Sequence, residues 1–174
     1  KPGSPARTAA AKGAPNILVW MIDDAGFGQL HSYGGLIDTP TTDQLAQQGL
    51  RFNNFHTAAL CSATRASFLT GRNSHAVSVG GHSGAATDFP GYWSRVPKSA
   101  ATIAKVLQGS GYTTYALGKW DHLPGEDISP AGPFTYWPTG QGFDHFYGFM
   151  AAEMGHYQPT MWADQTPVDP WRGK

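Results

Sequence analysis

Cys61 is the one cysteine among 174 residues, so it cannot form a disulfide within the chain. It is a free thiol, a metal ligand or a reactive group. Cys61 opens a short run with helical spacing, and a helix N-terminus stabilises negative charge through its backbone N–H groups. Arg65 follows four residues later, one turn away on the same face. The pair could bring a nucleophile and a permanent cation to one anion, although a lone cysteine is more often a small buried side chain.

Asp23 and Asp24 form a second candidate site, directly before the flexible run Ala-Gly-Phe-Gly. Two carboxylates that face one point need a cation between them. Oxygen ligands alone favour Ca²⁺ or Mg²⁺ over zinc. The alternative interpretation is a solvated turn in which both side chains cap backbone amides.

A third group lies in the segment Gly-Lys-Trp-Asp-His of residues 118–122. Lys119 can hold an anionic oxygen, and His122 can transfer protons. Each residue taken singly fits a solvated loop with Trp120 anchored in the core. Three groups of complementary chemistry at successive predicted strand ends favour a shared site.

The elements that must position these residues alternate between apolar runs and helical patterns. A buried central strand is predicted at 16–22, helices at 39–49, 62–69 and 99–108, and further strands at 51–55 and 112–117. This order indicates an α/β fold with a predominantly parallel central sheet flanked by helices. In such folds ligands gather at the carboxyl ends of the strands.

Other features of the sequence limit the class of protein. The formal net charge of zero gives no global field for nucleic acid or an anionic membrane, and the longest apolar run, residues 17–22, has only the length of a strand. Periodicity is lost after Asp121, and residues 124–142 are predicted to form a long ordered loop. Residues 1–14 are expected to be a flexible leader, rich in Ala, Pro and Gly.

The resemblance to a known family becomes specific at residues 61–72, Cys-Ser-Ala-Thr-Arg-Ala-Ser-Phe-Leu-Thr-Gly-Arg. This segment resembles the signature of the formylglycine-dependent (type I) sulfatases, which belong to the alkaline phosphatase superfamily. The similarity covers roughly residues 15–169. Segments 129–133 and 142–149 are similar to bacterial arylsulfatases in particular.

The resemblance implies an alkaline-phosphatase-like sulfatase fold, with residues 15–174 as the N-terminal part of the catalytic domain. It also implies that a formylglycine-generating enzyme converts Cys61 to Cα-formylglycine, whose hydrated aldehyde attacks the sulfur of a sulfate ester. A divalent metal, usually Ca²⁺, would be held by Asp23, Asp24 and the modified residue 61. Arg65 would steady the diol, and Lys119 would bridge residue 61 and a sulfate oxygen.

Three departures from the family pattern affect these assignments. Ala63 stands where Pro is commonest in the signature. The usual Gly-Lys-Trp-His is replaced by Gly-Lys-Trp-Asp-His, so either His122 takes the histidine role through a one-residue shift, which we favour, or Asp121 occupies the place. The later metal ligands, a second His and a second Lys have no counterpart before Lys174, and the context of Asp164 and Asp169 does not suit them.

Two alternative functions remain at this point. The first is a phosphonate or phosphate monoester hydrolase, because such enzymes of the superfamily use the same nucleophile. The second is an inactive binding fragment, because the metal site within this sequence is incomplete. Of the six histidines other than His122, none has zinc-ligand spacing with Cys61, and His75, close after the motif helix, is the one to watch. We expect a small-molecule sulfate ester as substrate, no nucleic acid or membrane partner, and a periplasmic or secreted location, with a cytoplasmic one as the alternative.

Overall fold

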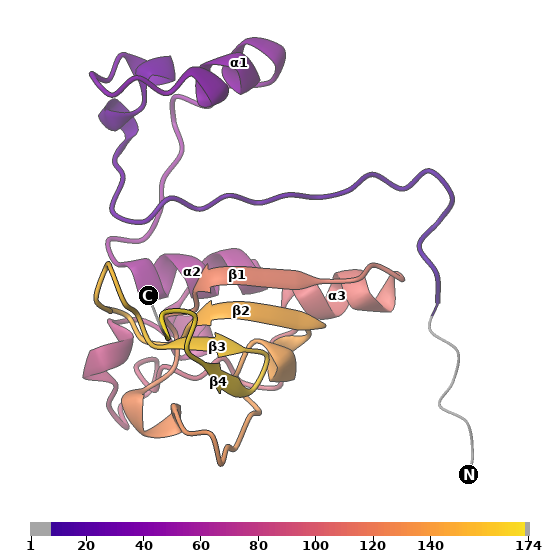
Figure 1. The fold of residues 1–174 in the computed structure, drawn as a ribbon, viewed down its shortest axis with the longest axis vertical. Helices are drawn as coiled ribbons and strands as arrows, with labels where there is room; N and C mark the ends of the chain where they lie inside the picture. The colour runs from indigo at the N-terminus through magenta and orange to yellow at the C-terminus, as the bar shows by residue number, and fades with distance from the viewer. Residues whose placement is uncertain (1–7, 173–174) are drawn as a thin grey trace. The chain divides into compact units, whose positions relative to one another are not determined.

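The computed structural model describes residues 8–172, which fall into two compact units (Figure 1). The large unit contains residues 8–15 and 58–172, and the small unit contains residues 16–57. Residues 1–7 of the predicted leader lie outside the described residues. Among the described residues, no helix has both the length and the apolar character that a membrane span requires.

The large unit is built on one sheet with the strand order β1-β2-β3-β4, visible as adjacent arrows in Figure 1. Its strands are β1 (Tyr115–Lys119), β2 (His145–Phe149), β3 (Met161–Ala163) and β4 (Thr166–Val168). Only β1 and β2 pair in parallel, while β2–β3 and β3–β4 are antiparallel. The α/β class is therefore correct, but the sheet is mixed and not predominantly parallel.

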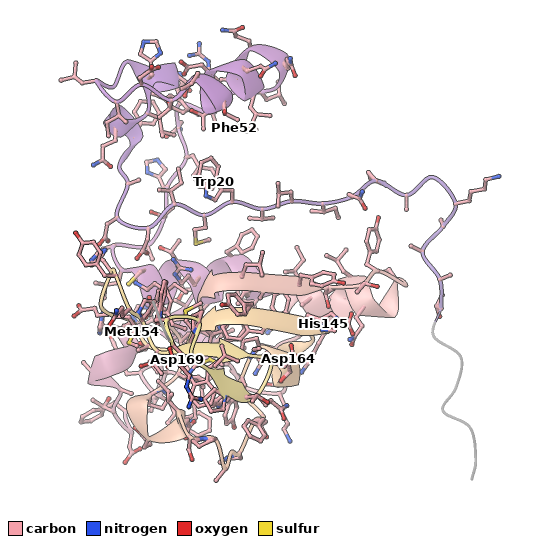
Figure 2. The ribbon with its side chains drawn as sticks, in the orientation of Figure 1. Trp20, Phe52, His145, Met154, Asp164 and Asp169 are labelled. Carbon is pink, nitrogen blue, oxygen red and sulfur yellow. The ribbon has the colours of Figure 1, made fainter. Side chains whose placement is uncertain are left out.

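A tight turn explains the antiparallel pairing of β3 and β4. Ala163 pairs with Thr166, so only Asp164 and Gln165 connect β3 to β4, a connection too short for anything but a hairpin. Asp164 has φ +54°, and its Oδ1 accepts a hydrogen bond from Phe146 N at 2.8 Å. Figure 2 shows Asp164 near His145, whose Nδ1 lies 3.8 Å from Asp164 Oδ2.

The predicted strands at 16–22 and 51–55 are wrong. Both segments lack strand structure in the described chain, and Leu18 is 93% exposed. Trp20, labelled in Figure 2, also lies on this extended segment. An apolar run is no strand by itself, because strand hydrogen bonds come from a neighbouring strand. In the small unit only one isolated bridge forms, between Leu30 and Ile37.

The helix predictions are confirmed, with one shifted start. Helix α1 (Pro40–Gln48) forms the predicted small-unit helix, and α2 (Cys61–Thr70) begins at the cysteine. Gly71 ends α2 with φ +65°, a conformation that glycine adopts at little cost. Helix α3 (Ile103–Gly109) begins four residues later than expected, because the Thr102 hydroxyl caps it by accepting from Lys105 N at 3.2 Å.

Short 3₁₀ helices connect these elements: η1 (Phe27–Gln29), η2 (His31–Tyr33), η3 (His75–Val77), η4 (Ser83–Ala85), η5 (Gly125–Asp127) and η6 (Thr139–Gln141). The predicted long loop at 124–142 contains η5 and η6 and no α-helix or strand. It is nevertheless fixed to the core. Trp137 is fully buried, its ring meets that of Trp162 edge-on at 4.8 Å, and its Nε1 donates to Asp127 O at 2.9 Å.

Two groups of buried apolar residues hold the large unit together. The larger contains Leu69, Trp120, Leu123, Trp137, Phe146, Met150 and Trp162, and the smaller contains Ala66, Val77, Val79, Val96 and Ala100. Helix α2 contributes Leu69 to the first group and Ala66 to the second. The helix that begins at Cys61 is thus anchored by burial in both groups.

Candidate functional site

Cys61 occupies the first position of α2. Leu60 before it has extended backbone angles, φ −124° and ψ 146°, and its carbonyl accepts from Thr64 N at 3.0 Å, which closes the first turn. The thiol is partly exposed. The predicted location of the cysteine at a helix start is confirmed, and the first-turn amides of α2 lie next to it.

The C-terminal end of β1 supplies the charged side chains. Strand pairing continues past Lys119, because Trp120 N donates to Phe149 O at 3.0 Å and Asp121 N to Met150 O at 3.2 Å. The side chains of Lys119 and Asp121 meet beyond the end of β1. Their Nζ and Oδ2 atoms lie 3.3 Å apart, whereas Trp120 enters the core.

The close approach of β1 and β2 helps to shape this end. Gly148 pairs with Gly118, and a Cβ on Gly148 would lie 1.9 Å from Gly118 O. Gly118 itself has φ +86°, and Asp121 has φ +59°. These two left-handed positions on either side of Lys119 turn the chain out of the regular strand, and Asp tolerates such a conformation better than most residues.

Asp121 lies at the centre of a buried polar cluster. Its side chain has no exposed surface, and its Oδ1 accepts hydrogen bonds from Ser62 Oγ at 2.8 Å and Ser83 Oγ at 3.0 Å. Its Oδ2 lies 3.3 Å from Lys119 Nζ and 3.8 Å from Arg65 Nε. We call these residues, Ser62, Arg65, Ser83, Lys119 and Asp121, the Asp121 cluster.

Arg65 ties the helix to the strand within this cluster. Its Nη1 donates to Lys119 O at 2.9 Å, and its side chain is only 13% exposed. Cys61 and Arg65 share a face of α2 as predicted, and both lie against Asp121. The structure thus brings together three of the predicted site residues, Cys61, Arg65 and Lys119.

The environment of Cys61 favours the protonated thiol. Burial raises the pKa of the thiol above its ordinary value, and the Asp121 carboxylate raises it further through a hydrogen bond and through its negative charge. Lys119 acts in the opposite direction on the same pKa but is outweighed. A thiol held in this form is a poor nucleophile at neutral pH, because the thiolate is the reactive species.

His122 faces away from this cluster. It is buried, its Nδ1 donates to Trp120 O at 2.8 Å, and its ring lies 4.0 Å from that of Trp120. The carbonyl can only accept, so the proton belongs on Nδ1. Burial lowers the pKa of His122 to about 4, and the ring is neutral at pH 7. The proton-transfer role of His122 stays a prediction, and Asp121 occupies the place beside Cys61.

The buried neutral His122 makes stability depend on pH. Above its unfolded pKa of about 6.5 both states are neutral, but between pH 6.5 and 4 only the unfolded state takes up the proton. Stability therefore falls as the pH falls through this window, by about 3 kcal/mol in total. Urea unfolding at a series of pH values between 7 and 4 measures this decrease in the free energy of unfolding.

A matched pair of variants isolates this contribution. His122→Asn keeps an N–H donor for Trp120 O but cannot take up a proton, so its unfolding free energy should decline less steeply between pH 6.5 and 4. His156→Asn, at an exposed histidine, should follow the parent protein. Equal slopes for all three proteins would contradict the assignment of a neutral buried imidazole.

Asp23 and Asp24 belong to the small unit. They line a pocket of about 490 Å³ together with Trp20, Ile22 and residues of α1, and Asp24 has φ +50°. Their oxygens suit Ca²⁺ in kind, but they supply only part of the about six to eight ligands that this ion takes. Within residues 8–172, no group of three or more His, Cys, Asp or Glu side chains is arranged to hold a metal ion.

The comparisons with known proteins agree with the motif at α2. The family model described as Sulfatase matches residues 15–168. The chain belongs to the sulfatase family.

Curated relatives of this sulfatase-family chain include arylsulfatases and a steryl-sulfatase. Bovine arylsulfatase A is 41% identical over 141 residues, 80% of this chain and 26% of the relative. Mouse steryl-sulfatase is 36% identical over 89% of this chain and 25% of the relative. The arylsulfatase of Klebsiella aerogenes is 30% identical over 88% of this chain and 32% of the relative. The chain thus spans about a quarter to a third of their length.

Two solved structures support the α/β fold of this chain. The crystal structure of Ps i-CgsB in complex with k-i-k-neocarrahexaose matches with a TM-score of 0.67 and 26% identity, over 84% of this chain and 35% of that chain. A second crystal structure of Ps i-CgsB matches with a TM-score of 0.59 and 32% identity, over 76% of this chain and 27% of that chain.

Sequence reasoning missed two residues of the Asp121 cluster in this sulfatase-family chain, Ser62 and Ser83, and it named Asp121 only as the less favoured alternative to His122. Ser62 follows the cysteine directly, but no periodicity marks its contact with Asp121. Ser83 lies in η4, and nothing in its local sequence signals the site.

Proposed function

We propose that this chain carries the nucleophile and two active-site cations of a sulfuric ester hydrolase of the arylsulfatase type. The reaction is cleavage of a sulfate monoester to an alcohol or phenol and sulfate. The observation that supports it most is the convergence of Cys61, Arg65 and Lys119 around the Asp121 carboxylate. A sulfuryl group is anionic and needs fixed cations around it.

The state of Cys61 is consistent with the need for modification. Its raised pKa keeps the sulfur protonated, so the unmodified side chain is a poor attacking group. In the proposed enzyme a formylglycine-generating enzyme converts Cys61 to Cα-formylglycine, whose hydrated form supplies an oxygen nucleophile. The location of residue 61, partly exposed at the start of α2, leaves the side chain accessible to substrate.

The two cations of the Asp121 cluster have different roles in this proposal. Lys119 donates to a sulfuryl oxygen, while Arg65, held by its bond to Lys119 O, steadies the side chain of residue 61. Asp23 and Asp24 would contribute oxygen ligands to Ca²⁺ or Mg²⁺, which would supply Lewis-acid polarisation when bound. The orientations of Arg65 and Lys119 follow from their own contacts with the protein.

One experiment tests the modification independently of turnover. The protein is produced with and without the modifying enzyme, and the tryptic peptide of residues 52–65 is analysed by mass spectrometry after trapping with an aminooxy reagent. We expect a loss of about 18 Da at residue 61 and an aldehyde adduct, only when the modifying enzyme is present. An unmodified thiol under both conditions would overturn the proposal.

A second measurement decides the ester class. The modified protein is assayed for kcat/KM on 4-nitrophenyl sulfate, phenyl phosphonate and phosphate esters under identical conditions. We expect the sulfate ester to be preferred. Preference for a phosphonate or phosphate ester would assign the chain to a sister activity, and no hydrolysis by an aldehyde-bearing protein would favour a binding role.

A further inference from the structure

The burial of Asp121 requires an explanation, because a carboxylate removed from water is costly unless it is paired and hydrogen-bonded. Asp121 has no exposed surface, and its four neighbours in the cluster come from three separate parts of the chain. Cluster members Ser62 and Arg65 lie on α2, Ser83 on η4 and Lys119 on β1. The buried Asp121 carboxylate therefore interacts with side chains from all three elements.

The two carboxylate oxygens of Asp121 have different partners. Oδ1 accepts from the hydroxyls of Ser62 and Ser83, and Ser83 N donates to Ser62 Oγ at 3.1 Å, which fixes the Ser62 hydroxyl in turn. Oδ2 is thereby directed toward the cations, 3.3 Å from Lys119 Nζ and 3.8 Å from Arg65 Nε. The two serines thus fix the orientation of the carboxylate, and the carboxylate in turn restricts the positions of the two cationic side chains.

Lys and Arg side chains lose much rotamer freedom when they are ordered. Asp121 restricts both before any substrate arrives, at 11% exposure for Lys119 and 13% for Arg65. Two cations against one carboxylate leave a net positive charge at the cluster. Preorganised cations of this kind contribute more to catalysis than mobile ones.

We propose that Asp121 is a positioning residue that holds Lys119 and Arg65 in fixed orientations beside residue 61, with Ser62 and Ser83 as its anchors. This inference rests on the proposed function for its catalytic consequence, but the positioning itself does not. It also distinguishes Asp121 from His122, whose hydrogen bond runs to the backbone of Trp120. Asp121 is assigned no proton transfer.

Asp121→Asn tests the proposal, because a positioning role and a pure charge effect predict opposite changes in the affinity for inorganic sulfate. The amide keeps the shape and can still accept from both serines, but it removes the negative charge. If charge alone mattered, the more positive cluster would bind inorganic sulfate more tightly. If Asp121 positions the cations, sulfate binding weakens and kcat/KM on 4-nitrophenyl sulfate falls about 10- to 100-fold, since misplacement by about 1 Å has effects of this size.

NMR of the Lys119 ammonium group, whose Nζ lies 3.3 Å from Asp121 Oδ2, reports on positioning without any activity. In the parent protein we expect a sharp signal protected from exchange with water, and in Asp121→Asn a broadened or rapidly exchanging one. If the parent shows this signal but hydrolyses no ester, the proposed function fails and the positioning stands. An unchanged signal with kcat/KM within twofold of the parent would overturn the positioning role.

Ser83→Ala keeps the test decisive if Asp121→Asn does not fold. It removes one of the two anchors and leaves every charge in place, so kcat/KM should fall about three- to tenfold with a smaller change in the Lys119 signal. Ser74→Ala, at another buried serine, is the matched control and should leave both readouts unchanged. If Ser83→Ala and Ser74→Ala had the same kcat/KM and the same NMR signal, the proposal would be contradicted.

Discussion

Replacing Cys61 with alanine is expected to abolish the aldehyde adduct at residue 61 and to lower kcat/KM on aryl sulfates by at least about 10³-fold. The reason is that the substitution removes the side chain from which the nucleophile of the proposed reaction is made. Removal of an enzyme nucleophile commonly has effects of this size or larger. Mass spectrometry and steady-state kinetics on the same preparation measure both outcomes.

The fold should survive this substitution, because Cys61 is only partly buried and α2 is anchored by Ala66 and Leu69. Ser67→Ala, also a removal of a small polar group from α2, is the matched control and should keep the adduct and the activity. If Cys61→Ala retained more than a tenth of the parent's kcat/KM, the nucleophile would lie elsewhere.

Replacing Lys119 with methionine is expected to lower kcat/KM by about 10²- to 10³-fold, the usual effect of removing a preorganised group that stabilises developing charge. The same change removes one of the two cations next to the fully buried Asp121 carboxylate. Unfolding free energy should therefore also fall, by about 2 kcal/mol. Lys98→Met, at an exposed lysine, should change neither quantity.

The double variant Lys119→Met with Asp121→Asn separates these two effects. Removing the carboxylate as well leaves no uncompensated charge from this pair, so part of the lost stability should return. Activity should not return, because the cation is still missing. A Lys119→Met protein with kcat/KM within threefold of the parent would show that Lys119 does not contact the sulfuryl group.

Local signals in the sequence predicted the helices well. Pro40 is the first residue of α1, and Gly71 ends α2, so local backbone preferences decide these elements within a few residues. The regular spacing of a helix also placed Cys61 and Arg65 on one face of α2. The start of α3 was predicted four residues too early, because the hydroxyl that caps this helix belongs to Thr102.

The strands were harder to predict. Strands β3 and β4 have three residues each, too few for a periodic pattern, and β4 contains Pro167. The apolar run at 16–22 had the composition of a buried strand but forms no ladder within the described residues. Strand formation depends on a partner elsewhere in the chain, which composition does not reveal.

The sequence by itself determined the chemical groups and their local spacing: one cysteine at a helix start, Arg65 one turn later, and a lysine at the end of a strand. The tertiary structure decided which of them meet. Ser62 and Asp121 are 59 residues apart, and Arg65 and Lys119 are 54 apart. Such contacts follow from how α2 packs against β1, and local periodicity carries no information about that packing. For the same reason only the structure could place Asp121, and not His122, beside Cys61.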